Sequence, residues 1–407
     1  MRTVTQGRTT TASHSAFAAF GVFWGTWGAA LPALRDAAGL DNAALGTALL
    51  FVGLGALPAM LLSGRAVDRF GARAAGWLLI SLALAGVITA VLARDLPTLA
   101  VAMALVGATS GAADVAANAL AGLAEQRSGR RVITISHAVF SSFVVIGSLG
   151  TGVLRATGAD VMTVFIVAGA LMTVAGAMAL VLGDGPQPAS RAKPARRRDG
   201  LRLVLPFVAV GLVGALGFAA ENAHQSWSAI FLADELGAAP GITAIAPATF
   251  AAFTALTRFA AGAFTRIPTG GLLVGGAVTA LLGTLLLSIS QDLPLALGGL
   301  ALAAIGTSVL FPTLLSQATR DVPADRRGRA TSAVATTAYL GFVLGPVYVG
   351  FLAAEVGMRG AMVGIAIPIA AFAVLAPVVV RRRVHTAAVD GQGSITSMPT
   401  RSDTASR

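Results

Sequence analysis

Two carboxylates, Asp114 and Glu221, stand inside long apolar stretches of the chain. An ionised carboxylate at membrane depth is costly unless it is paired, so such groups usually face a cavity and carry protons or bind substrate. For either acid the alternative is a buried structural role, and for Glu221 the nearby apolar stretch offers Arg258 as an ion-pair partner. These residue types predict proton-linked binding chemistry or a buried ion pair.

Polar side chains cluster directly after Glu221. Within 221–228, Asn222 and His224 lie beside Trp227, together with Gln and Ser residues. A helix with so many donors and acceptors is expected to line water or a ligand, because lipid would leave these groups unsatisfied. Aromatic rings beside hydrogen-bonding groups are typical of sites for small polar molecules. The segment therefore predicts a substrate site.

Further candidate residues lie on other apolar stretches. Trp24 is expected to face the same cavity from the first stretch, whereas Trp27 and Trp227 fit equally well as anchors at the membrane interface. Asn118 and His137, with Ser141 and Ser142, are candidates for a second polar group. A histidine there either relays protons or makes a packing hydrogen bond.

The chain is too apolar for a water-soluble protein of its size. It has 407 residues, of which 56% are hydrophobic and 12% charged, and its mean hydropathy is +0.79. Crossing about 30 Å of hydrocarbon takes roughly 20 residues of helix. We predict an all-α integral membrane protein with about twelve transmembrane helices, at 14–35, 44–63, 74–93, 97–122, 132–154, 161–183, 203–232, 241–263, 270–289, 293–317, 330–353 and 358–380.

Basic residues are concentrated in every second connecting loop. If the N-terminus is cytoplasmic, most Lys and Arg fall in inner loops, and the outer loops keep only Arg35, Arg94, Arg155 and Arg359. This asymmetry predicts a multi-pass protein of the bacterial inner membrane with both termini in the cytoplasm. It also accounts for the net charge of +11 without nucleic-acid binding, because the basic residues form no single patch.

The chain is predicted to contain two copies of one six-helix unit. At an offset of about 200 residues, Trp27 matches Trp227 and Gly129 matches Gly328, which is the pattern of a parallel repeat. The central segment is rich in Pro and Arg. The expected organisation is an N-terminal cytoplasmic segment 1–13, a first half 14–183, a cytoplasmic linker 184–202, a second half 203–380 and a disordered cytoplasmic tail 381–407.

A short charged loop follows the second apolar stretch. Its residues Gly64, Asp68, Arg69, Gly71 and Arg73 resemble the cytoplasmic loop 2–3 motif of the major facilitator superfamily. The resemblance implies that Asp68 holds an inner gate closed; the alternative is that these charges merely end a helix in water. The matching segment 262–267 has no acid, so an asymmetric gate is expected.

Three short sequence segments resemble one branch of this superfamily more specifically. Segments 114–118, 136–141 and 221–228 resemble a poorly characterised bacterial inner-membrane branch related to fucose-type sugar permeases. The resemblance implies a secondary transporter that moves a small solute, a sugar or another polar metabolite, by alternating access. Proton coupling through Glu221 or Asp114 is the expected energy source.

No enzyme or cofactor is expected. The sequence has no Gly-x-x-x-x-Gly-Lys-Ser/Thr loop, no cysteine and no metal-ligand spacing. The expected partners are a small-molecule substrate, protons and the lipid bilayer, with a monomer as the working unit. Two alternatives stay open, namely a proton-driven exporter of drugs or metabolites and a membrane sensor that transports nothing.

Overall fold

The computed structural model describes residues 2–71, 73–183, 201–261 and 268–393, and these residues form helices without a strand. The helices of the first half have the bounds α1 Arg2–Ala37, α2 Asn42–Phe70, α3 Arg73–Leu92, α4 Leu96–Ser128, α5 Val132–Ala156 and α6 Val161–Leu182. Those of the second half are α7 Leu201–Leu236, α8 Pro240–Thr243, α9 Ile245–Ala261, α10 Thr269–Ile289, α11 Leu293–Thr319 and α12 Ala324–Gly393.

The structure confirms the prediction of about twelve membrane crossings. Among the described residues, 11 helical stretches are long and apolar enough to span a bilayer. The last of them, Arg326–Val379, has 54 residues and is interrupted at Gly357, whose φ of 74° breaks the helix. It therefore supplies two crossings, and the other ten bring the number to twelve. The short helix α8 and α9 together make one crossing.

Some boundaries differ from those predicted. Helix α1 begins at Arg2 rather than near residue 14, and α12 continues to Gly393, past the predicted start of a disordered tail. No Pro or Gly interrupts residues 378–390, so nothing in that segment stops the helix. The predicted linker, apart from its last two residues, and residues 394–407 lie outside the described residues.

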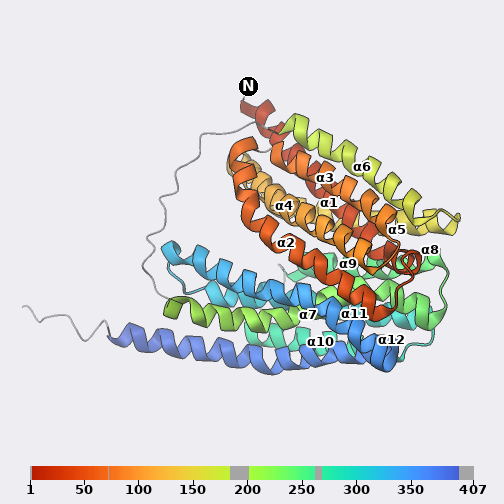
Figure 1. The fold of residues 1–407 in the computed structure, drawn as a ribbon. Coiled ribbons are helices and arrows are strands. Elements are labelled where there is room, and N and C mark those ends of the chain that lie inside the picture. The colour runs from red at the N-terminus through yellow and green to blue at the C-terminus, as the bar shows by residue number, and fades with distance from the viewer. Residues whose placement is uncertain (1, 72, 184–200, 262–267, 394–407) are drawn as a thin grey trace, which may run out of the picture.

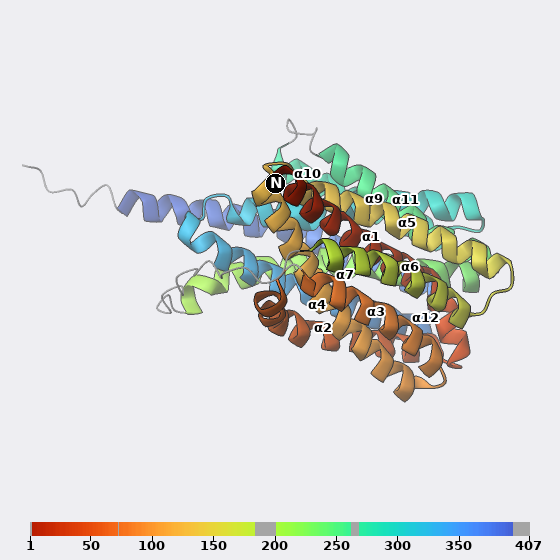
Figure 2. The same cartoon turned by 90° about the horizontal axis from the view of Figure 1, so that it is seen from above.

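The two halves lie side by side. In Figure 1 the first half, coloured red to yellow, lies above the second half, coloured green to blue. In Figure 2, seen from above, the first half therefore lies in front of much of the second. Equivalent helices begin in the same way: Asp95 caps α4 by accepting from Thr98 N at 2.9 Å, and Asp292 caps α11 by accepting from Leu295 N at 2.8 Å. Both caps precede a Leu-Pro pair, as expected for a duplicated unit.

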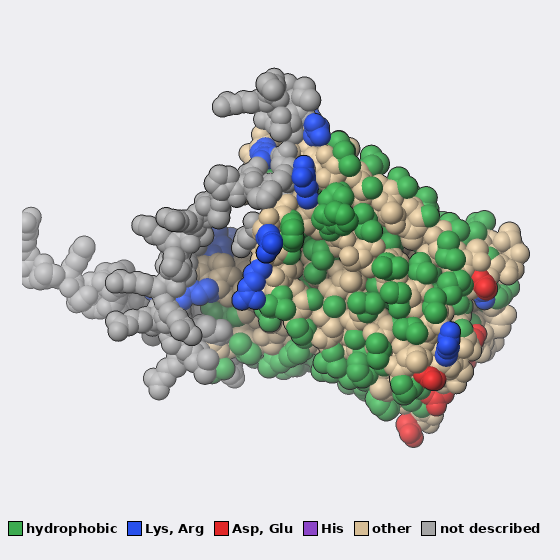
Figure 3. All heavy atoms as spheres, turned by 45° about the horizontal axis from the view of Figure 1, so that its top comes forward, with side chains coloured by type: hydrophobic (Ala, Val, Ile, Leu, Met, Phe, Trp, Pro, Cys, Tyr) green, Lys and Arg blue, Asp and Glu red, His purple; other side chains and the backbone are tan. Residues whose placement is uncertain are grey.

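Charge separates the two ends of the bundle. Figure 3 shows most Lys and Arg side chains at one end and Asp and Glu at the other. The basic end holds the α2–α3 and α4–α5 connections, with Arg69, Arg73 and Arg130. The acidic end holds the α1–α2 connection and the end of α7, with Asp41 and Asp234.

Candidate binding cavity between the two halves

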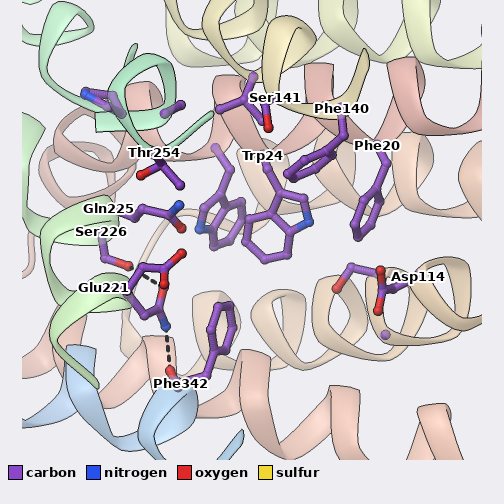
Figure 4. Close-up of a pocket in the computed structure, with 18 of the residues that line it drawn as sticks. Phe20, Trp24, Asp114, Phe140, Ser141, Glu221, Gln225, Ser226, Thr254 and Phe342 are labelled. Carbon is purple, nitrogen blue, oxygen red and sulfur yellow. Dashed lines mark hydrogen bonds between the residues drawn. The ribbon is translucent and has the colours of Figure 1, made fainter. Parts of the chain in front are cut away.

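A cavity of about 270 Å³ lies between the two halves, midway along the helices. Helices α1, α2, α4 and α5 form one wall, and α7, α9 and α12 form the other. The side chains nearest its centre are drawn in Figure 4. The lining residues are Phe20, Trp24, Trp27, Gly28, Met60, Ser110, Gly111, Asp114, Phe140, Ser141, Val144, Glu221, Asn222, Gln225, Ser226, Pro247, Ala251, Thr254, Arg258, Tyr339 and Phe342.

An ion pair lies in the second-half wall. Arg258 Nη2 donates to Glu221 Oε1 at 2.8 Å, and Arg258 Nε donates to Ser308 O at 3.3 Å. The Arg258 side chain is 45% exposed and the Glu221 side chain only 12%. The second carboxylate oxygen, Glu221 Oε2, is buried and has no hydrogen-bond partner among the described residues. The ion pair expected as a structural alternative is therefore present, and it lines the cavity.

Amide and hydroxyl groups surround this pair. Asn222 Nδ2 donates to Phe342 O, which ties α7 to α12. Gln225 lies on the same face of α7, one turn after Glu221. The hydroxyl of Thr254 is buried without a partner among the described residues. Thr254 was not among the residues singled out by sequence; its spacing of four residues before Arg258 was the available signal.

Four aromatic residues, Phe20, Trp24, Trp27 and Phe140, lie in the first-half wall. The Phe20 ring centroid lies 6.2 Å from that of Trp24 and 5.6 Å from that of Phe140, and the Trp24 and Trp27 centroids are 6.2 Å apart. Phe20, Trp24 and Trp27 follow helical spacing along α1. Phe20 and Phe140 were missed by sequence, although the spacing of Phe20 from Trp24 marks them as neighbours on one helix face.

Asp114 lies in the first-half wall and heads a chain of hydrogen bonds. Asn118 Nδ2 donates to Asp114 Oδ1 at 3.0 Å and to Asp114 O at 2.9 Å. Asn118 Oδ1 lies 3.2 Å from His137 Nε2. Asn118 and His137 are not among the lining residues, whereas Ser141 of the predicted second polar group is. Asn118 and His137 are therefore linked to the cavity through Asp114.

His224 and Trp227 lie outside the cavity lining. His224 Nδ1 lies 2.7 Å from Ala220 O and Nε2 lies 3.1 Å from Thr284 Oγ1, while Trp227 Nε1 donates to Pro346 O at 3.1 Å. Each residue turns an α-helix by roughly 100°. This rotation carries His224 and Trp227 away from the face that presents Glu221, and both side chains are fully buried.

The charged loop after α2 has a defined helix end. Gly71 has a φ of 61° and its N–H donates to Val67 O at 2.8 Å, so this position suits glycine. Arg69 lies over the Phe70 ring at 5.7 Å and Arg73 Nε donates to Gly183 O at 3.4 Å. These contacts stay within the first half. The Asp68 side chain and residues 262–267 lie outside the described part of the chain, as does the predicted gate contact.

The two halves are joined at the acidic end. Arg35 of α1 makes a two-pronged contact with Asp234 of α7, at 2.6 Å from Nη1 and 2.8 Å from Nη2, and its Nη1 also donates to Asn42 at 2.8 Å. Nearby, α2 and α12 approach so closely that a Cβ on Gly46 would lie 3.0 Å from Gly350 Cα. The two halves are therefore in direct contact at the acidic end.

Comparisons with known proteins place this geometry in a family. The Major Facilitator Superfamily pattern matches residues 14–231 and again residues 210–397. The chain is 31% identical over 362 residues to an uncharacterized transporter, y4wD, of Sinorhizobium fredii, covering 88% of this chain and 94% of that protein. It is 30% identical over 358 residues to an uncharacterized MFS-type transporter of Yersinia pestis, covering 83% and 87%. The chain belongs to the Major Facilitator Superfamily.

Solved structures share the fold. One is a bacterial homolog to the human lysosomal transporter Spinster, in an inward-facing and occupied conformation, with a TM-score of 0.71 at 16% identity. It covers 91% of this chain and 96% of its own. Another is the nucleoside transporter NupG, with a TM-score of 0.69 at 15% identity, covering 92% and 98%. These likenesses establish the fold of a multi-pass membrane transporter.

Proposed function

We propose that this protein is a proton-coupled secondary transporter that moves a small polar solute across the bacterial inner membrane by alternating access. The observation that carries the proposal is the cavity between the halves, where one oxygen of Glu221 is paired with Arg258 and the other is buried without a partner among the described residues. Carboxylates at membrane depth that face a cavity usually belong to proton relays or substrate sites.

The proposed orientation follows from the two charged ends. The basic end is assigned to the cytoplasm because Lys and Arg favour cytoplasmic loops. The acidic end, where Arg35 pairs with Asp234, then faces outward. On this assignment the structure is closed to the outside, and transport requires the pair to separate when the halves rock about the central site.

Proton coupling is assigned to Glu221, with Asp114 as the second carboxylate of the cavity. Protonation of Glu221 would remove the charge that holds Arg258 and leave a neutral acid able to donate a hydrogen bond. The state of this pair would then depend on which side of the membrane the cavity faces. The resemblance to fucose-type permeases supports uptake of a polar solute.

A second candidate is export of amphipathic cations. The ring wall of Phe20, Trp24 and Phe140 lies beside Asp114, and aromatic faces with a carboxylate suit an organic cation. This candidate predicts that Asp114, not Glu221, governs the pH dependence of flux.

The test is flux into proteoliposomes that contain a trapped pH indicator. Sugars, polyols, nucleosides and cationic drugs are added in turn, and solute-driven proton movement is recorded. We expect a polar solute to drive proton movement in the wild type, with roughly tenfold loss in Glu221→Gln and a smaller loss in Asp114→Asn. Glu355→Gln, an exposed acid outside the cavity, is the matched control.

Each other outcome has a defined meaning. Proton movement that depends on Asp114 and is driven by cations supports the exporter. Solute flux without proton movement overturns coupling. Saturable ligand binding without flux of any solute favours a sensor.

A further inference from the structure

We propose that the transported solute carries a carboxylate on an apolar or aromatic body, and that this carboxylate replaces Glu221 as the partner of Arg258. The inference rests on the proposed function, because it names the substrate class of the same cavity. It follows from the placement of charges and unpartnered groups around Arg258.

Arg258 is the one basic side chain among the described residues that line the cavity. A neutral sugar needs no cation, and a charged side chain at membrane depth is costly and usually serves a function. The Arg258 side chain is 45% exposed, although the side chain of its partner Glu221 is only 12% exposed. The cation is thus open to a ligand while its own partner is shielded.

The guanidinium also has a hydrogen-bond donor available for a ligand. Its hydrogen bonds to described residues use Nη2, to Glu221, and Nε, to Ser308 O, and leave Nη1 without a bond among them. Arginine binds carboxylates best through two parallel hydrogen bonds. If Glu221 withdraws, Nη1 and Nη2 together present such a pair.

Thr254 supplies a second contact at the same place. It lies one turn before Arg258 on α9, so both side chains share a helix face toward the cavity. Its buried hydroxyl has no partner among the described residues. A buried hydroxyl without a partner carries a free-energy cost, which a ligand oxygen would relieve.

Charge balance couples binding of the substrate carboxylate to uptake of a proton. A substrate anion entering beside the ionised Glu221 would add an uncompensated negative charge to the cavity. One proton taken up by Glu221 cancels that charge, whatever the state of Asp114. Anion and proton would therefore enter together, with the substrate oxygens taking the place of Glu221 at Arg258.

Other titratable groups of the described residues lie around the ion pair. Asp114 and Tyr339 line the cavity from α4 and α12. His224 on α7 is bonded to Ala220 O and near Thr284. His137 on α5 hydrogen-bonds toward Asn118 and lies within electrostatic reach of Arg258.

The rings across the cavity fit the rest of such a molecule. Phe20, Trp24 and Phe140 form an apolar face opposite the ion pair, as Figure 4 shows. A flat apolar body would pack against this face while its carboxylate contacts Arg258. The two walls thus bind different parts of one solute.

The experiment measures binding to the purified full-length protein by titration calorimetry, at acidic and at alkaline pH. Phenylacetate is compared with phenylacetamide, which has the same shape without the charge, and gluconate with glucitol. We expect phenylacetate to bind at least about tenfold more tightly than its amide, and more tightly at acidic pH. Equal binding of acid and amide, or binding of neither acid, overturns the proposal.

Variants locate the contact. Arg258→Gln should remove the preference for phenylacetate, and Glu221→Gln should retain it while abolishing its pH dependence. Thr254→Val, a small change that leaves the ion pair intact, should weaken the binding of phenylacetate by a few fold. Thr257→Val is the matched control, because its hydroxyl donates within its own helix to Phe253 O at 2.7 Å. Equal losses in both threonine variants count against the site.

Binding and flux separate this inference from the proposed function. If a carboxylate binds through Arg258 but is not transported into proteoliposomes, the proposed ligand class holds and the proposed transport function is wrong. If a neutral solute is transported with protons and carboxylates do not bind, the transport function holds and the proposed ligand class is wrong.

Discussion

The two walls of the central cavity differ sharply although they come from copies of one unit. The first-half wall has four aromatic residues, two serines and one acid, Asp114, without an ion pair among the described residues. The second-half wall holds the Glu221–Arg258 pair with amide and hydroxyl groups, beside the rings of Tyr339 and Phe342. Duplication fixed where the helices run, and side-chain divergence decided what each wall recognises. A symmetric scaffold thus surrounds an asymmetric site.

Trp27 and Trp227 show this divergence at a single repeat position. Trp27 lines the cavity and packs on Phe23 at 5.8 Å between ring centroids. Trp227 is fully buried, donates to Pro346 O and lies beside Gly350 at the contact between α7 and α12. One indole faces the site, and its counterpart holds two helices of the second half together.

The largest expected effect separates the indole that packs two helices, Trp227, from an indole on the cavity wall, Trp24. Trp227→Ala should destabilise the protein by about 3–5 kcal/mol, because it opens a void in a packed contact and removes the hydrogen bond to Pro346 O. Trp24→Ala, on the cavity wall, should cost less stability but weaken ligand binding. Thermal unfolding in detergent, beside a binding titration, measures both quantities. Equal destabilisation by the two variants would contradict the assigned roles.

A second prediction concerns the closed acidic end. Gly46→Leu should force the halves apart there, at a cost of about 1–3 kcal/mol to the described state, because the nearest atoms belong to the backbone of α12. The natural chain has no cysteine, so Ser110→Cys in the cavity reports accessibility to a membrane-impermeant maleimide.

Labelling of Ser110→Cys should shift toward the acidic side when Gly46→Leu is added. Gly150→Leu is the matched control, since a Cβ there meets nothing within 4 Å. Unchanged labelling in the Gly46 variant would show that this contact does not hold the acidic end closed.

The smallest effect is expected where the two halves still match. Asp95→Ala and Asp292→Ala each remove a helix cap of the same geometry, so each should lower the unfolding temperature by a similar amount, roughly 1 °C. Asp95→Asn, which keeps a capping acceptor, is the control. A much larger loss in one half would show that the caps are no longer equivalent.

Asp95 adds a pH dependence with a definite sign. Hydrogen bonds from the Thr98 side chain and backbone hold the pKa of Asp95 below its ordinary value of 3.8. Its stabilisation is therefore complete above that value and is lost as pH falls through the lower folded-state pKa. Unfolding of wild type and Asp95→Asn across acidic pH should converge at the low end.

The sequence determined the membrane class, the twelve crossings and the repeat, because these depend on segment length, hydropathy and charge in each loop. It also marked Asp114, Glu221, Asn222 and Trp24 as residues that the structure brings to one cavity. These are polar or bulky side chains in apolar helices, where their cost makes them stand out.

Only the tertiary structure decided which neighbours share a face of the cavity. His224 and Trp227 stand within a few residues of Glu221, yet helix rotation turns them into packed contacts. Phe20, Phe140 and Thr254, from three different helices, become part of the site. Such convergence depends on the crossing and rotation of helices far apart in the chain, which hydropathy and local spacing do not encode.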